Sequence, residues 1–119
     1  MNTIDLQVHS NFSDGRHTPR EVVIMAKEKG VQVISLTDHD TVAGLAEALA
    51  TGEELGVKII PGVEISAEEH GIHILGYGID YKNAELLAEL EKAKQGRLEG
   101  AKKMVANLQG AGFIVEWED

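Results

Sequence analysis

The chain has 119 residues and no cysteine, and 43% of its residues are hydrophobic although only 4% are aromatic. This length supports one domain with a core of aliphatic side chains, while the lack of cysteine excludes disulfides and thiolate zinc sites. The formal net charge is −9, from 20 acidic and 11 basic residues, and such a surface excludes general nucleic-acid binding by counterion release.

The first predicted elements are a strand and a helix. An apolar run at residues 4–8 is typical of a short strand. Thr18, Pro19 and Glu21 then form a capping box with proline at the first helical position, so we expect a helix from there to about Lys29.

The middle of the chain alternates between strands and a helix. Residues 33–36 form an apolar, β-branched run that predicts the second strand, and Thr41 is expected to cap a helix that ends near Gly56. Residues 58–63 and 72–79 predict two further strands. Because strands alternate with helices, the pattern indicates right-handed crossovers and about four parallel strands.

The last main element is a long helix. Asn83 is positioned to cap it, and aliphatic residues recur at helical spacing from about 84 to 109. Gly96 and Gly100 weaken its middle by about 1 kcal/mol each relative to alanine. Residues 113–117 show a weak strand pattern. Together the elements predict an α/β fold in one domain, with mostly parallel strands.

Metal-competent side chains occur beside the apolar runs in five short stretches. These stretches are residues 5–9, 13–15, 37–40, 62–64 and 72–74. Loops that follow buried strands are where α/β proteins assemble active sites, and converging imidazole and carboxylate groups suit divalent metals. The sequence therefore predicts a metal site in one cleft at the strand ends.

His39 is the side chain in these stretches that helix capping does not explain. Helix capping explains Asp40 and, in part, Asp38, because both lie just ahead of Thr41, where the second helix is expected to begin. We assign His39 to the metal, and we expect Asp38 or Asp40 to accept a hydrogen bond from its imidazole and so fix its tautomer. A carboxylate as close to an apolar strand as Glu64 is costly to bury unpaired, which favours metal coordination there too.

Position alone favours ordinary structural roles for the other histidines. At a strand end, His9 taken alone would be a surface or hydrogen-bonded residue. His73, between two isoleucines, would be a hydrogen-bonded core residue. His17 and His70 are expected to be solvated at the surface.

The order of these stretches resembles that of the PHP family, named for polymerase and histidinol phosphatase. That family opens with Asp-Leu-His-x-His and continues with Ser-Asp-Gly, Thr-Asp-His-Asp, Pro-Gly-Val-Glu-Ile-Ser and His-Ile-Leu-Gly-Tyr. The matching residues here are 5–9, 13–15, 37–40, 61–66 and 73–77. The resemblance extends over nearly the whole chain, and the subgroup most similar to it comprises stand-alone phosphoesterases and RNA-trimming exonucleases.

The resemblance implies a fold and a set of metal ligands. The fold is an incomplete PHP-type barrel, a distorted TIM-like barrel, in which residues 1–119 form the N-terminal portion, with strand–helix units over 1–80 and the long helix over about 84–109. Glu64 would bridge two ions. The implied ligands are His9, Asp14, His39, Glu64 and His73.

Gln7 is a departure from the family pattern, since it stands where the family has the first histidine of His-x-His. Because Val8 points to the opposite face of the strand, Gln7 and His9 share a face, and we expect Gln7 to point into the site. An amide oxygen is a weaker ligand than imidazole. We therefore treat Gln7 as a weak or lost ligand and expect its adjoining metal position to be empty or weakly held.

The function implied by the resemblance is metal-dependent hydrolysis of phosphoester bonds. The substrate would be a small phosphorylated compound, a nucleotide or an RNA end, attacked by a metal-activated water rather than by a protein nucleophile. The full family site holds up to three divalent ions of manganese, zinc, iron or magnesium. Fewer are expected here, because Gln7 replaces one ligand and the family supplies others after the point where this chain ends.

Two alternatives and three further expectations accompany this hypothesis. One alternative is a non-catalytic metal-binding PHP module, impaired by Gln7 and by the missing distal ligands. The other, a Rossmann-like nucleotide-binding domain, is disfavoured because no glycine-rich turn follows the first strand. We expect no membrane span or leader, hence a cytoplasmic protein. We also expect either self-association that covers exposed sheet edges or a chain that is only the ordered part of a longer protein.

Overall fold

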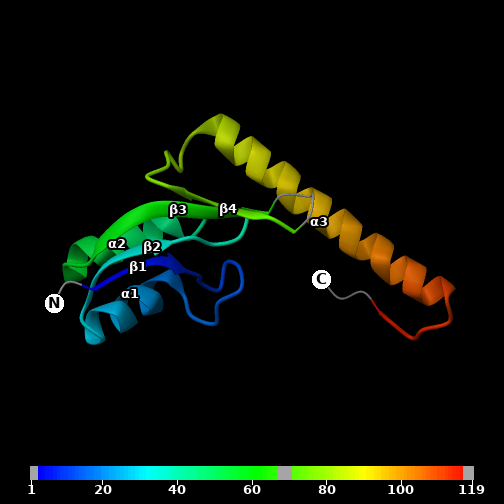
Figure 1. Cartoon of the computed structure of the whole chain (residues 1–119), viewed down its shortest axis with the longest axis horizontal. Coiled ribbons are helices and arrows are strands. Elements are labelled where there is room, and N and C mark those ends of the chain that lie inside the picture. The colour runs from blue at the N-terminus through cyan, green and yellow to red at the C-terminus, as the bar shows by residue number, and fades with distance from the viewer. Residues whose placement is uncertain (1–2, 67–70, 117–119) are drawn as a thin grey trace.

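The computed structural model describes residues 3–66 and 71–116 as a curled sheet with three helices (Figure 1). Three of its strands are parallel, and the expected α/β class is confirmed. The elements in chain order are β1 (Thr3–Val8), α1 (Pro19–Glu28), β2 (Val31–Leu36), α2 (Leu45–Leu55), β3 (Lys58–Ser66), β4 (His73–Tyr77) and α3 (Ala84–Gly110).

The described strands form one sheet in the order β1-β2-β3-β4. β1 is parallel to β2 and β2 to β3, but β4 is antiparallel to β3. The expectation of about four parallel strands is therefore wrong for β4. The connection between Ser66 and His73 is much shorter than the dozen or so residues that a parallel crossover requires.

The sheet curls strongly enough to bring its two outer strands into contact. The hydroxyl of Tyr77 in β4 donates a hydrogen bond over 2.7 Å to the carbonyl of Leu6 in β1. The pairing of β1 with β2 is irregular between Asp5 and Val8, and such a bulge leaves backbone groups outside the regular ladder. This curvature is that of an incomplete barrel.

The core lies between the sheet and the helices α1 and α2, which pack against one another. Its most deeply buried side chains include Val23, Ile34, Leu36, Leu45 and Val63. By contrast, α3 extends away from this core (Figure 1), and among the described residues Leu90 is the only buried one in that helix. The position of α3 therefore depends on few contacts.

Local signals set two of the three helix starts. At α1 the Thr18 hydroxyl accepts from the Glu21 N–H over 3.1 Å, and the capping box is confirmed. The Asn83 side chain likewise accepts from the Leu86 N–H at the start of α3.

Two local expectations are wrong. Thr41 was expected to cap the second helix, but α2 follows Gly44, and the Thr41 hydroxyl accepts from the Ala43 N–H within a turn ahead of the helix. Residues 113–116, the described part of the predicted strand at 113–117, are not a strand. Trp117 lies outside the described residues.

Candidate metal centre

The strand directions bring four of the predicted ligands to one edge of the sheet. His9 follows β1, His39 follows β2, and Glu64 lies near the end of β3. Carboxyl ends of parallel strands meet at a common edge. Because β4 is antiparallel to β3, its first residue, His73, lies at the same edge and pairs in register with Ser66.

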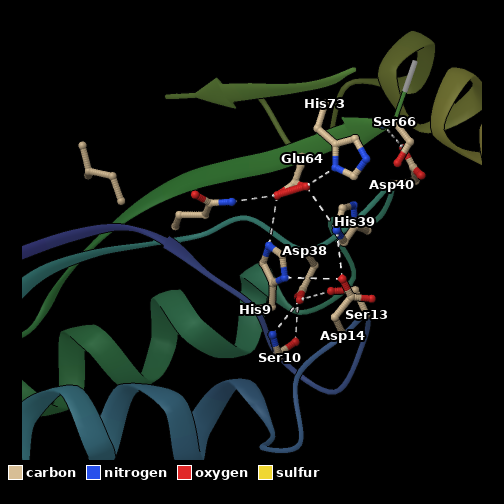
Figure 2. Close-up of polar contacts among 12 residues, drawn as sticks. His9, Ser10, Ser13, Asp14, Asp38, His39, Asp40, Glu64, Ser66 and His73 are labelled. Atoms are coloured by element: carbon tan, nitrogen blue, oxygen red, sulfur yellow. Dashed lines mark hydrogen bonds and ion pairs between the residues drawn. The ribbon is translucent and has the colours of Figure 1, made fainter. Parts of the chain in front are cut away.

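The Glu64 carboxylate is the centre of this group (Figure 2). Its Oε1 atom lies 3.2 Å from His9 Nε2. Its Oε2 atom lies 3.1 Å from His39 Nε2 and 2.7 Å from His73 Nδ1. Only 4% of the Glu64 side chain is exposed, so three imidazoles surround a buried carboxylate.

Asp14 reaches the group from the loop after β1. Its Oδ2 atom lies 2.9 Å from His39 Nε2 and 3.7 Å from His9 Nδ1. The loop folds back this tightly because residue 15 is glycine: a Cβ there would lie 2.4 Å from the His9 carbonyl oxygen. The turn is closed by a hydrogen bond of 2.8 Å from the Gly15 N–H to the Ser10 carbonyl.

The surroundings of Glu64 determine its charge. Burial acts to raise the pKa of this carboxyl, but hydrogen bonds from His73 and Gln7 and the charges of His39 and His9 outweigh burial and lower the pKa below its ordinary value. Glu64 is therefore an ionised, buried carboxylate, which is a strong oxygen ligand for a cation.

Gln7 points into the site, as its strand position predicts. Its side-chain Nε2 donates to Glu64 Oε1 over 3.1 Å. The same oxygen faces His9, whereas the other carboxylate oxygen of Glu64 faces His39 and His73. Gln7 thus takes part as a hydrogen-bond donor.

Asp38 and Asp40 do not make the expected hydrogen bond to the His39 imidazole within the described part of the chain. Asp38 is buried and accepts three hydrogen bonds, from the Ser10 N–H, the Ser10 hydroxyl and the Ser13 hydroxyl, at 2.6, 2.6 and 2.7 Å. Asp40 accepts from the Ser66 N–H and pairs with an arginine of α3. The backbone turns both side chains away from the ring that lies between them in sequence.

Two partners of these aspartates were missed from the sequence. Ser10 lies outside the recognised motifs, and Arg97 lies in the distant helix α3, so neither carries a local signal. Of the two histidines expected at the surface, His17 is exposed and contacts Glu21 over 3.1 Å. His70 lies outside the described residues.

The donor set fits a divalent metal ion. Ligand atoms of His9, His39 and Glu64 all lie within 4.8 Å of one another. Imidazole nitrogen and carboxylate oxygen suit zinc, manganese and iron. Asp14, with 63% of its side chain exposed, and His73, with 48%, leave the group open to solvent. The site is therefore accessible to an ion and to a ligand bound on it.

Comparison with known proteins finds a family model and relatives with named activities. The model of the PHP domain family matches residues 5–112. The chain is 44% identical to a 3',5'-nucleoside bisphosphate phosphatase from Chromobacterium violaceum, over 95% of this chain and 40% of that protein. It is 42% identical to a 5'-3' exoribonuclease from Haemophilus influenzae, over 92% of this chain and 40% of that protein.

A solved structure supports the fold assignment. The structure of a proposed metal-dependent phosphoesterase from Bifidobacterium adolescentis matches with a TM-score of 0.83 at 33% identity, over 98% of this chain and 41% of that one. The chain thus spans about 40% of the length of the relatives it matches. Because the family match extends over most of its residues, the chain belongs to the PHP domain family.

Proposed function

We propose that this chain forms part of a metal-dependent phosphoesterase and that the group around Glu64 binds its divalent ions. The observation that carries the proposal is the convergence of three imidazoles on one buried carboxylate, with Asp14 beside them. Among the described residues, the proposed ligands are His9, Asp14, His39, Glu64 and His73.

The side chains support hydrolysis by water rather than by a protein nucleophile. When bound, divalent ions supply Lewis-acid polarisation of phosphate oxygens and lower the pKa of water. The hydroxyls of Ser10 and Ser13 donate to Asp38, and that of Ser35 donates to the Ile60 carbonyl. These three hydroxyls are therefore engaged in structural hydrogen bonds.

The proposed substrate is a small phosphorylated compound, a nucleotide or an RNA end. The named activities of the two relatives, on nucleoside bisphosphates and on RNA, support this range. The net charge of −9 favours terminal or small phosphates over long nucleic acids, since bound cations would attract phosphate only locally. We propose manganese, zinc, iron or magnesium as the ion, with fewer than three bound because Gln7 donates to Glu64.

The location and assembly of the protein are also proposals. Within the described residues, no helix combines the length and the apolar character needed to cross a bilayer, and we propose a cytoplasmic location. Apolar side chains are exposed on both outer strands, at Ile4 and Leu6 of β1 and at Ile74 of β4. Self-association would cover these edges, and light scattering with and without EDTA measures it.

Elemental analysis of protein purified without chelator tests the metal proposal, followed by hydrolysis of a generic phosphomonoester with added Mn²⁺. We expect bound metal in the wild-type chain and its loss in His39→Ala. His17→Ala is the matched control, because the exposed His17 imidazole contacts Glu21 at the surface. Metal binding without hydrolysis would favour the alternative of a non-catalytic metal-binding module, and absence of bound metal would contradict both functions.

A further inference from the structure

Asp40 is a buried carboxylate at the junction of three segments. It follows His39 at the end of β2, and none of its side chain is exposed. Its backbone adopts a left-handed conformation with φ of 52°, which is uncommon for a residue other than glycine. The Asp40 side chain contacts the Ser66 N–H and Arg97 rather than the neighbouring His39 ring.

The contacts of Asp40 join the turn that carries His39 to the strand that carries Glu64. The Asp40 N–H donates to the Glu64 carbonyl over 2.9 Å, and the Glu64 N–H donates to the Asp38 carbonyl over 3.1 Å. Asp40 Oδ1 accepts from the Ser66 N–H over 3.0 Å. The backbone and side chain of Asp40, together with the Asp38 carbonyl, thus hold the turn that carries His39 against the strand that carries Glu64.

The remaining oxygen of Asp40 faces α3. Asp40 Oδ2 lies 3.2 Å from Arg97 Nε, an ion pair without the alignment of a hydrogen bond, and within the described residues Arg97 is the only cationic side chain paired with Asp40. A buried carboxylate without a partner is costly. Since Leu90 is the only buried residue among those described in α3, this ion pair is also one of the few ties between α3 and the core.

We propose that Arg97 is a positioning residue for the metal centre. By pairing with Asp40, it keeps the Asp40 side chain on the Ser66 N–H and so fixes the His39 turn against β3. Docking of α3 would then set how well His39 and Glu64 are placed for an ion. This inference rests on the proposed function, because its functional consequence is metal affinity.

A cobalt titration of the full chain tests the proposal, with Co²⁺ as the probe and its visible absorption as the signal. In Arg97→Met we expect about tenfold weaker Co²⁺ binding, the lower end of the effect of removing a residue that supports metal ligands. Arg97→Lys should recover part of the affinity because it restores the charge. Arg20→Met is the matched control: Arg20 is similarly exposed, at 49% against 52%, and pairs with Glu54 at the surface.

Amide hydrogen exchange at Ser66, measured without metal, separately tests whether Arg97 keeps the Asp40 side chain on the Ser66 N–H. We expect faster exchange of the Ser66 N–H in Arg97→Met than in the wild type and in Arg20→Met. Unchanged Co²⁺ affinity in Arg97→Met would overturn the proposed positioning. If the wild-type chain bound no Co²⁺, the proposed function would fail. The exchange rate of the Ser66 N–H would then be the remaining test of the role of Arg97. Equal rates in the wild type and in Arg97→Met would show that Arg97 does not hold Asp40 on the Ser66 N–H.

Discussion

Gln7 and Glu64 are joined by a hydrogen bond of 3.1 Å between the side-chain amide and the carboxylate. The amide donates to the oxygen that also faces His9. A cation next to that oxygen would compete with the amide for the same lone pairs. Gln7 therefore provides a neutral donor to one carboxylate oxygen of Glu64, whereas His39 and His73 face the other oxygen.

Replacing Gln7 by histidine is expected to raise the number of metal ions bound per chain. An imidazole at this position adds a nitrogen ligand beside His9 and removes the competing amide donor. Elemental analysis after equilibration with Mn²⁺ measures the change. Gln7→Ala is the control, because it removes the amide without adding a ligand. Equal stoichiometry in Gln7→His and in the wild type would show that Gln7 does not limit metal binding.

Glu64→Gln is expected to destabilise the metal-free chain at neutral pH, and the loss should shrink in acid. The pKa of Glu64 is lowered in the folded chain, against burial, by His73, His39, Gln7 and His9. Its ionised form therefore contributes stability above the ordinary pKa of 4.5, and this contribution is lost as the pH falls through the lower, folded-state value. Urea unfolding in EDTA from pH 7 to pH 3 measures the difference, and a constant difference would contradict the assignment.

Gly15→Ala is expected to displace Asp14 and weaken metal binding. The added Cβ would lie 2.4 Å from the His9 carbonyl oxygen, so the loop must open, at a cost of about 1–3 kcal/mol in the free energy of unfolding. Gly100→Ala is the control, since nothing lies within 4 Å of its Cβ position in α3. This change should stabilise the chain by about 0.5–1 kcal/mol. Thermal unfolding without Mn²⁺ measures the change in stability, and the additional stabilisation by Mn²⁺ measures the change in metal binding.

Local chemistry explains what was predictable in the fold. The capping residues Thr18 and Asn83 act on N–H groups three residues away, so the starts of α1 and α3 follow from the sequence. Convergence of His9 and His39 at one sheet edge follows from the parallel strands once these are recognised, whereas His73 reaches that edge because β4 is antiparallel. The direction of β4 depends instead on the length of the β3–β4 connection, which the apolar pattern of the strand does not encode.

Long-range pairing explains what was missed in the site. Gln7 and Glu64 are 57 residues apart, and the Asp40–Arg97 pair likewise joins the turn after β2 to a distant helix. No periodicity links such residues. The aspartates of the Thr-Asp-His-Asp stretch were expected to contact the adjacent imidazole, but Asp38 accepts from the loop after β1 and Asp40 accepts from the Ser66 N–H.

Asp38→Asn and Asp14→Asn are expected to change different properties, although each replaces a carboxylate by an amide at the loop after β1, to which Asp14 belongs and with which Asp38 makes hydrogen bonds. Asp38 is buried and accepts hydrogen bonds from the Ser10 N–H and from the hydroxyls of Ser10 and Ser13. An amide there turns one acceptor oxygen into a donor that faces other donors. We expect a loss of about 1.5–3 kcal/mol in the free energy of unfolding, as for a hydrogen bond to a charged group.

Asp14 is exposed, with its carboxylate beside His39, and its replacement should leave the free energy of unfolding within about 0.5 kcal/mol of wild type. Since Asp14 is a proposed ligand, Asp14→Asn should weaken Mn²⁺ binding in a titration. Urea unfolding in EDTA and Mn²⁺ titration, applied to both variants, give the comparison. A stable Asp38→Asn chain would show that the Ser10–Ser13 loop does not depend on this carboxylate, and an unchanged Mn²⁺ affinity in Asp14→Asn would remove Asp14 from the ligand set.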